Sequence, residues 1–330
     1  MTVVVLLSDK RSGSTMLEEE ICRHPDISTV AYTPHTFRET QHFLKGAVML
    51  GMPPTMFEGG RRYRNYGSAA DARAYLIDCV RGNVPDFVPP RDDRSLVFAG
   101  WDALCARFAR PVFFEKSPHH LSSWGALSLL LEWIETTARP VRVIGLTRNP
   151  LAVQASAEKL FATDPEGRQH AWLLKQQNLL TLAAMLPDGI YRHVRYEDVV
   201  ARPADMLAEL YTFIGVDPAP AFARSSDVNA ASLETWREDD AFTLQLTPEV
   251  RQMARAFGYR DEELDNPVSP EAARAKAAMA AATRRRRRSM RLRHIVVDRV
   301  AKPALMRLGL WQTLMRSEER RVGKECATGC

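Results

Sequence analysis

Residues 3–17 read VVVLLSDKRSGSTML, and this stretch decides the fold. Its first five residues are an unbroken apolar run, typical of a strand that is buried on both faces of a parallel sheet. Polar residues follow around one glycine, and helical spacing begins at Thr15. The order of strand, polar loop and helix predicts a βα unit of an α/β sheet, in which ligands bind beyond the carboxyl end of the strand.

The polar loop has the chemistry of an oxyanion site. The N-terminus of a helix offers unpaired N–H groups and the positive end of a dipole. The loop adds two cations, three hydroxyl groups and a flexible glycine, which are Lys10, Arg11, Ser12, Gly13, Ser14 and Thr15. We expect these residues to bind phosphate or a similar group. The simplest alternative is a basic turn with a Ser/Thr helix cap and no ligand.

A nucleoside-triphosphate loop of a kinase is a second alternative. Its motif places a lysine directly before the Ser or Thr, after the second glycine. Here Lys10 precedes Gly13, the one glycine of the loop, and Ser14 occupies the position of the lysine. The spacing therefore disfavours a kinase.

Two further strands are predicted to end in charged motifs. Residues 112–114 are apolar and precede the letters EKSP, which places Lys116 at the carboxyl end of a strand. Residues 141–146 are also apolar and precede TRNP and a helix, on which Ser156 lies two turns beyond Arg148. An Arg guanidinium with a Ser hydroxyl suits a phosphate monoester.

These motifs together resemble the sulfotransferase family, which uses 3′-phosphoadenosine 5′-phosphosulfate (PAPS) as sulfuryl donor. KRSGSTML is similar to its 5′-phosphosulfate loop, and TRNP with Ser156 to its 3′-phosphate element. EKSP is similar to the element whose lysine, here Lys116, lies beside the sulfuryl group. RYEDVV is similar to a third motif, in which Tyr196 would reach the adenine. The resemblance implies a P-loop-like three-layer α/β/α sandwich with a mainly parallel sheet, PAPS as co-substrate and no metal.

The resemblance leaves the catalytic base open. Many relatives have a glutamate after the second strand, but residues 29–34 contain no acid. The nearest competent groups are His35 and Glu39, and a base with a pKa near neutrality suits removal of a hydroxyl proton. His119 and His120 could bind zinc, but we find no third ligand at suitable spacing and expect no metal.

Sequence periodicity predicts further elements. We expect a helix over residues 15–24, a second strand over 27–31 and a long helix over 170–186. We also expect one helix to follow RYEDVV. Gly and Pro interrupt residues 40–110, which makes this region uninformative. The resemblance implies an insertion there that helps to bind the acceptor, which would be a small molecule, a carbohydrate or a lipid.

The charge is distributed unevenly along the chain. We expect a catalytic domain over residues 1–265 and a basic helical extension over 266–316. Residues 284–316 hold eleven Arg and Lys against one acid. The simplest interpretation is a solvated basic helix. Because residues 284–311 also carry apolar side chains, contact with an anionic membrane surface is the next alternative, ahead of contact with nucleic acid. Residues 317–330 lack periodicity, and we interpret them as a non-native tail.

Composition favours a cytoplasmic protein. The chain opens on a core strand rather than on a signal segment, and its five cysteines show no metal-type spacing. A peripheral location at the inner membrane face is compatible with the basic extension. The remaining alternative is a donor-binding, membrane-associated protein without catalysis, because the glutamate of the relatives is missing. The sequence does not indicate an oligomeric state.

Overall fold

The computed structural model describes residues 1–35, 38–56, 66–161, 163–218, 233, 235–239, 242–267 and 289. The chain divides into two compact units. One comprises Met1–Arg148 and Trp172–Val228, and the other comprises Asn149–Ala171 and Asn229–Cys330.

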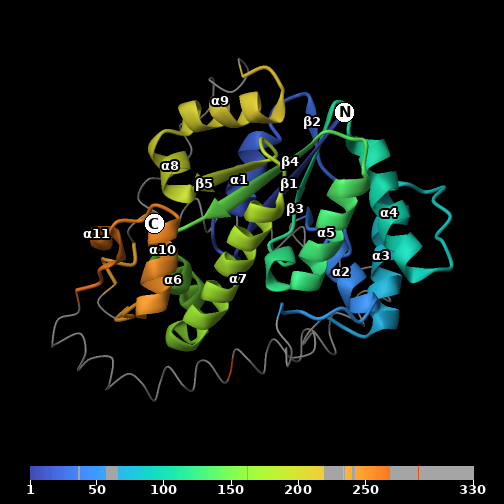
Figure 1. Ribbon diagram of the computed structural model, residues 1–330. Helices are drawn as coiled ribbons and strands as arrows, with labels where there is room; N and C mark the ends of the chain where they lie inside the picture. Colours follow the sequence, from blue (N-terminus) through green and yellow to red (C-terminus); the bar gives the residue numbers. More distant parts are fainter. Residues whose placement is uncertain are drawn as a thin grey trace. The chain divides into compact units, whose positions relative to one another are not determined.

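A five-stranded sheet forms the centre of the first unit (Figure 1). Its order is β2-β3-β1-β4-β5, and every pair of neighbours is parallel. The strands are β1 (Thr2–Ser8), β2 (Ile27–Ser28), β3 (Val112–Lys116), β4 (Val141–Thr147) and β5 (Tyr191–Arg195). Residues 3–7 of the central strand are fully buried, as expected for a strand covered on both faces. The predicted parallel sheet is confirmed.

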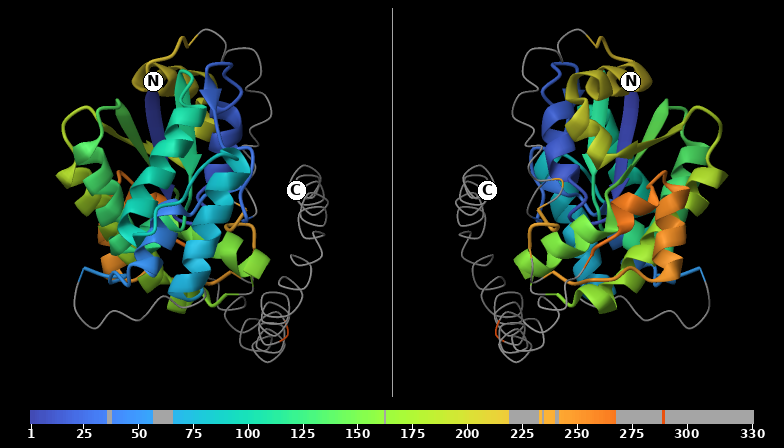
Figure 2. Two further views of the ribbon diagram at one scale, coloured as in Figure 1. Left: turned by 90° about the vertical axis from the view of Figure 1, so that its right-hand side faces the viewer. Right: turned by 90° about the vertical axis from the view of Figure 1, so that its left-hand side faces the viewer.

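Helices cover both faces of this sheet. The connection from β1 to β2 runs in one direction across the sheet. The connections from β2 to β3 and from β3 to β4 run in the opposite direction. Because parallel crossovers are right-handed, these connections lie on opposite faces. Helix α1 (Ser14–Ile21) lies on one face and contacts α9 (Pro203–Ile214), while α4 (Asp93–Phe108) and α5 (Trp124–Thr136) belong to the other (Figures 1 and 2). The predicted three-layer α/β/α sandwich is confirmed.

Residues 40–110, where the sequence was uninformative, contribute further helices. Helix α2 contacts both α3 and α5, and α3 contacts α4. Ser68 begins α3 through a capping box with Asp71.

The remaining elements are α2 (His42–Met49), α3 (Ala69–Asn83), η2 (His120–Ser122), α6 (Pro150–Phe161), α7 (Pro165–Met185), α8 (Tyr196–Ala201), α10 (Pro248–Ala256) and α11 (Asp261–Leu264).

Four predicted elements differ in their bounds from the structure. The long helix begins at Pro165 rather than at residue 170. The second strand is two residues long rather than 27–31, because the Asn83 side chain accepts hydrogen bonds from the Ala31 and Tyr32 N–H groups in place of a neighbouring strand. The first helix ends at Ile21 rather than at residue 24. The helix expected after β5 is two helices, because Pro203 has no N–H to continue α8 and instead begins α9.

The predicted C-terminal features fall mainly outside the described residues. The basic extension over 266–316 is described only at residues 266, 267 and 289, and the tail over 317–330 not at all. The proposed membrane-contacting segment, 284–311, is likewise described only at residue 289. Among the described helices, none has the length and apolar character needed to span a bilayer.

A buried histidine on α2 makes the fold sensitive to acid. The His42 Nε2–H group donates to the Val97 carbonyl at 2.7 Å, and the ring lies against Trp101. Burial lowers the pKa of His42 from 6.5 to about 4. The unfolded state therefore binds more protons below pH 6.5, so stability falls as the pH decreases.

We expect this histidine to contribute about 2 kcal/mol to the loss of unfolding free energy between about pH 7 and about pH 5. In urea unfolding, the His42→Gln variant should show a shallower pH dependence over this interval, because its amide can donate to Val97 without titrating. Parallel pH profiles for the two proteins would contradict this assignment.

Candidate active site

The parallel sheet brings the predicted motifs to one edge. Leu6 of β1 pairs with Lys116 of β3, and Thr147 of β4 pairs with Arg195 of β5. The loop after β1, the end of β3, Arg148 and Tyr196 therefore all lie at the carboxyl ends of neighbouring strands. This edge is where open α/β sheets bind their ligands.

The loop after β1 is held by a carboxylate that the sequence analysis did not single out. Asp9 is buried, accepts a hydrogen bond from the Lys10 N–H group at 2.7 Å and forms an ion pair with Lys175 on α7. The sequence feature that could have identified Asp9 as a site residue is its position between a predicted strand and two basic residues. Its partner lies far away in the sequence and could not be identified from the pattern.

The loop geometry fits an oxyanion ligand. Arg11 and Gly13 adopt left-handed conformations, with φ of 72° and 86°. Gly13 is the N-cap of α1, and no side chain in the described part of the chain caps this helix end. The buried Ser12 hydroxyl has no hydrogen-bond partner among the residues that the structure describes. A buried donor of this kind needs a partner, which an anionic ligand can supply.

Tyr196 and Arg148 support the loop from the neighbouring strands. A Cβ atom at Gly13 would lie 2.2 Å from Tyr196 Cδ2, so the ring packs directly on the glycine. The Arg148 guanidinium carbon lies 4.4 Å from the centroid of this ring, and Arg148 Nη1 donates to the Arg11 carbonyl at 3.2 Å. Ser156, the other residue predicted for the 3′-phosphate element, lies on α6 in the second unit.

Substitution of Gly13 should disrupt the loop. We expect Gly13→Ala to lower the unfolding free energy by about 2–4 kcal/mol, because it combines left-handed strain with overpacking against Tyr196. Gly189→Ala is a matched control, since Gly189 also has a positive φ but open space around its Cβ position. The Gly189→Ala control should lower the unfolding free energy by only about 1–2 kcal/mol. Equal losses in chemical denaturation would show that the contact with Tyr196 is unimportant.

Lys116 connects the loop to the candidate bases. Its side chain is fully buried, and Nζ lies 3.4 Å from Thr15 Oγ1 and 3.4 Å from Glu39 Oε1. Nζ also lies 3.2 Å from Glu18 Oε2 on α1. Glu18 was not predicted as a site residue, because an EEE run at residues 18–20 is typical of an exposed helix face. Its carboxylate is nevertheless only 1% exposed.

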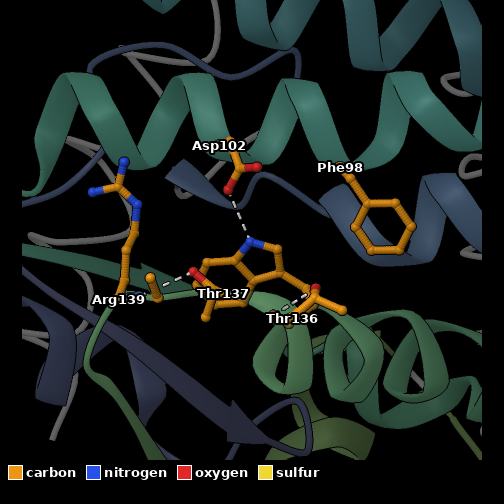
Figure 3. A pocket seen from close by; sticks show the side chains of 7 residues that line it. Phe98, Asp102, Thr136, Thr137 and Arg139 are labelled. Carbon is orange, nitrogen blue, oxygen red and sulfur yellow. Dashed lines mark hydrogen bonds between the residues drawn. The ribbon is translucent and has the colours of Figure 1, made fainter.

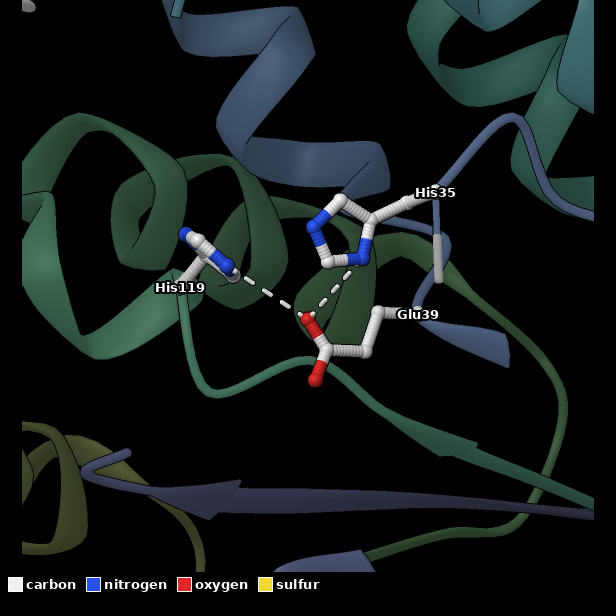
Figure 4. A group of neighbouring side chains, drawn as sticks. All are labelled: His35, Glu39 and His119. Carbon is white, nitrogen blue, oxygen red and sulfur yellow. Dashed lines mark ion pairs between the residues drawn. The ribbon is translucent and has the colours of Figure 1, made fainter. Parts of the chain in front are cut away.

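The two candidate bases lie side by side in the structure (Figure 4). Glu39 Oε2 is 3.4 Å from His35 Nδ1 and 3.4 Å from His119 Nε2. His119 Nδ1 is in turn 2.9 Å from the Tyr66 hydroxyl oxygen. His120, the sequence neighbour of His119, points instead toward the buried Glu115. His119 is therefore grouped with His35 and Glu39 rather than with His120.

Burial dominates the electrostatics of this cluster. It raises the pKa of Glu39 to about 7, against the opposing effect of Lys116, and it also raises the pKa of Glu18. Burial lowers the pKa of His119 well below 6.5, so this imidazole is neutral at pH 7. A carboxyl group with the pKa of Glu39 can accept a proton near neutral pH.

A separate cavity of about 510 Å³ lies between α4 and α5 (Figure 3). Within it, the Trp133 indole N–H donates to Asp102 Oδ1 at 2.9 Å. The cavity is lined by Phe98, Asp102, Trp133, Thr136, Thr137, Ala138 and Arg139. Residues 136–139 lead into the amino end of β4, so the cavity lies at the opposite edge of the sheet from the predicted site and contains none of its residues.

Comparisons with known proteins identify a family and a fold for this chain. A family model described as "Sulfotransferase family" matches residues 4–220. The sulfotransferase domain of the Synechococcus PCC 7002 olefin synthase superimposes with a TM-score of 0.52 at 19% identity, covering 79% of this chain and 95% of that domain. The sulfotransferase domain from the curacin biosynthetic pathway superimposes with a TM-score of 0.48 at 19% identity, covering 78% of this chain and 98% of that domain. The search of curated proteins gives no significant match.

The family match covers more than half of the chain. It includes the loop after β1, Lys116 and Arg148, and the solved olefin synthase domain has the same fold. This chain therefore belongs to the sulfotransferase family.

Proposed function

We propose that this enzyme transfers a sulfuryl group from PAPS to a hydroxyl or amine of a small-molecule, carbohydrate or lipid acceptor. The observation that carries the proposal is the position of Lys116, which contacts both Thr15 of the anion-binding loop and Glu39 of the candidate base cluster. A donor loop, a buried cation and a proton acceptor within one cluster provide the groups that such a transfer requires.

The donor site is assigned to the loop and to the ends of β4 and β5. Residues 10–15 would hold the 5′-phosphosulfate through backbone N–H groups, hydroxyls and cations. Arg148 would bind the 3′-phosphate. Tyr196 would lie near the adenine. PAPS, when bound, supplies an activated sulfuryl group with adenosine 3′,5′-bisphosphate as its leaving group.

We assign the base to Glu39 and a positioning role to His35. Glu39 Oε1 is adjacent to Lys116, so its carboxylate lies closer than His35 to the place where the sulfuryl group would be held. The acceptor oxygen or nitrogen forms a bond to sulfur while the bond from sulfur to the phosphate oxygen breaks, and Glu39 receives the acceptor's proton. Lys116 stabilises the charge that develops on the leaving oxygen. The proposed step uses no metal.

Calorimetry with nucleotides tests the donor site. We expect adenosine 3′,5′-bisphosphate to bind more tightly than ADP or AMP, because only this ligand offers a 3′-phosphate to Arg148. Arg148→Ala should weaken its binding by about 10- to 100-fold, whereas AMP binding should change little.

Arg148→Lys serves as the control that keeps the charge but loses the planar guanidinium. Equal affinity for ADP and adenosine 3′,5′-bisphosphate would overturn the assignment of Arg148 to a 3′-phosphate and of PAPS as the donor. Tight binding without turnover of PAPS in an acceptor screen would favour the donor-binding protein without catalysis.

A further inference from the structure

We propose that His35, Glu39 and His119 form a binding site for a zinc-class divalent cation, which competes with the acceptor for the same groups. Two imidazoles and one carboxylate are a ligand set suited to Zn²⁺ and Co²⁺. Mg²⁺ and Ca²⁺ prefer oxygen ligands throughout, so they fit this set poorly. The competition with acceptor rests on the proposed function, whereas the binding itself does not.

The distances in the cluster match a metal site better than a hydrogen-bonded group. Both His nitrogens lie 3.4 Å from Glu39 Oε2, beyond the usual hydrogen-bond length of about 2.7–3.2 Å. Ligand atoms about 2.1 Å from a tetrahedral Zn²⁺ are about 3.4 Å apart. All three ligand atoms lie within 4.8 Å of one another, so the remaining edge, between the two imidazole nitrogens, is at most 4.8 Å long.

The carboxylate oxygen at the centre of the cluster lacks a hydrogen bond. Glu39 Oε2 is buried and has no hydrogen-bond partner within the described part of the chain. Buried polar atoms are normally satisfied by protein, water or an ion. A cation placed between this oxygen and the two imidazoles would satisfy it.

Neighbouring groups orient the ligands as the partners of metal ligands usually do. The Tyr66 hydroxyl oxygen lies 2.9 Å from His119 Nδ1, and in the tautomer that donates Nδ1–H to this oxygen the Nε2 lone pair is directed toward Glu39. Lys116 holds the other oxygen of Glu39, while Glu18 offsets the charge of this lysine. Three protein ligands leave one coordination position for water. Because Lys116 is close, we expect weaker binding than at a structural zinc site with four protein ligands.

Metal titration of the full chain tests the site. We expect one equivalent of Zn²⁺ to be taken from a chromophoric chelator, and Co²⁺ to give the intense visible absorption of a tetrahedral complex. Glu39→Gln and His119→Gln should each weaken Zn²⁺ binding by about 100-fold or more, and Tyr66→Phe by about 10-fold. His170→Gln, which replaces an exposed histidine of α7, is the control and should leave binding unchanged.

Absence of saturable Zn²⁺ binding to the wild-type chain would overturn the proposal, as would equal binding by the ligand variants. If His119→Gln fails to fold in thermal unfolding, His35→Gln decides the question, because this side chain is partly exposed. Binding is measured without PAPS, so its outcome does not depend on the proposed transfer.

Zn²⁺ bound at this cluster should inhibit sulfuryl transfer competitively with acceptor. Binding without inhibition would support the metal site but overturn the competition and the assignment of Glu39 as base.

Discussion

Replacing Lys116 with methionine should lower kcat/KM for sulfuryl transfer by about 10²- to 10³-fold. Nζ lies 3.4 Å from both Thr15 Oγ1 of the loop and Glu39 Oε1. The side chain is fully shielded from water, and electrostatic stabilisation is stronger in such an environment. Turnover of PAPS can be measured with an acceptor found by screening, or as slow release of adenosine 3′,5′-bisphosphate when water is the acceptor. Methionine keeps the volume of the side chain, so the loss reports the charge.

The same variant should also lose stability. Removing Lys116 leaves the Glu18 and Glu39 carboxylates buried without their cation, which costs about 3–5 kcal/mol in comparable buried pairs. The double variant Lys116→Met/Glu18→Gln should recover part of this free energy of unfolding but none of the activity. A stable and fully active Lys116→Met enzyme would show that this lysine has no role at the sulfuryl group.

Glu39→Gln should lower kcat by about 10²- to 10⁴-fold, the usual contribution of a general base. The amide keeps the size of the carboxylate and its contact with the cluster, but it cannot accept the acceptor's proton. Affinity for adenosine 3′,5′-bisphosphate should be retained, because the donor site is assigned to other residues. A rate measurement at saturating PAPS therefore isolates the chemical role of Glu39.

The matched variant His35→Gln distinguishes the two candidate bases. As a positioning residue, His35 should contribute less than about 10-fold to kcat, since it acts only through the oxygen of Glu39 that faces away from Lys116. The opposite order of effects, with the larger loss in His35→Gln, would reassign the base to the histidine. The two candidates are 3.4 Å apart at their closest described atoms, so activity rather than proximity must separate them.

Local patterns were sufficient to predict the framework of this enzyme. A strand that is buried on both faces, such as β1, needs an apolar run, and its polar loop follows directly in the sequence. One stretch therefore predicted both the strand and the polar loop after it. Lys116 and Arg148 could be placed because each follows its strand directly, and parallel strands end at a common edge. Boundaries were less accurate where a distant side chain, such as Asn83 beside Ala31, replaced the backbone partner.

The sequence alone determined the α/β class, the polar loop after β1 and the strand-end cations, because these features depend on neighbouring residues and on short periodicities. Only the tertiary structure joined Glu18 to Lys116, Lys175 to Asp9, and His119 to Glu39. Such contacts join residues that are distant in the chain, so no local pattern contains them. They decide which carboxylates are buried beside a cation, and therefore the chemistry of this site.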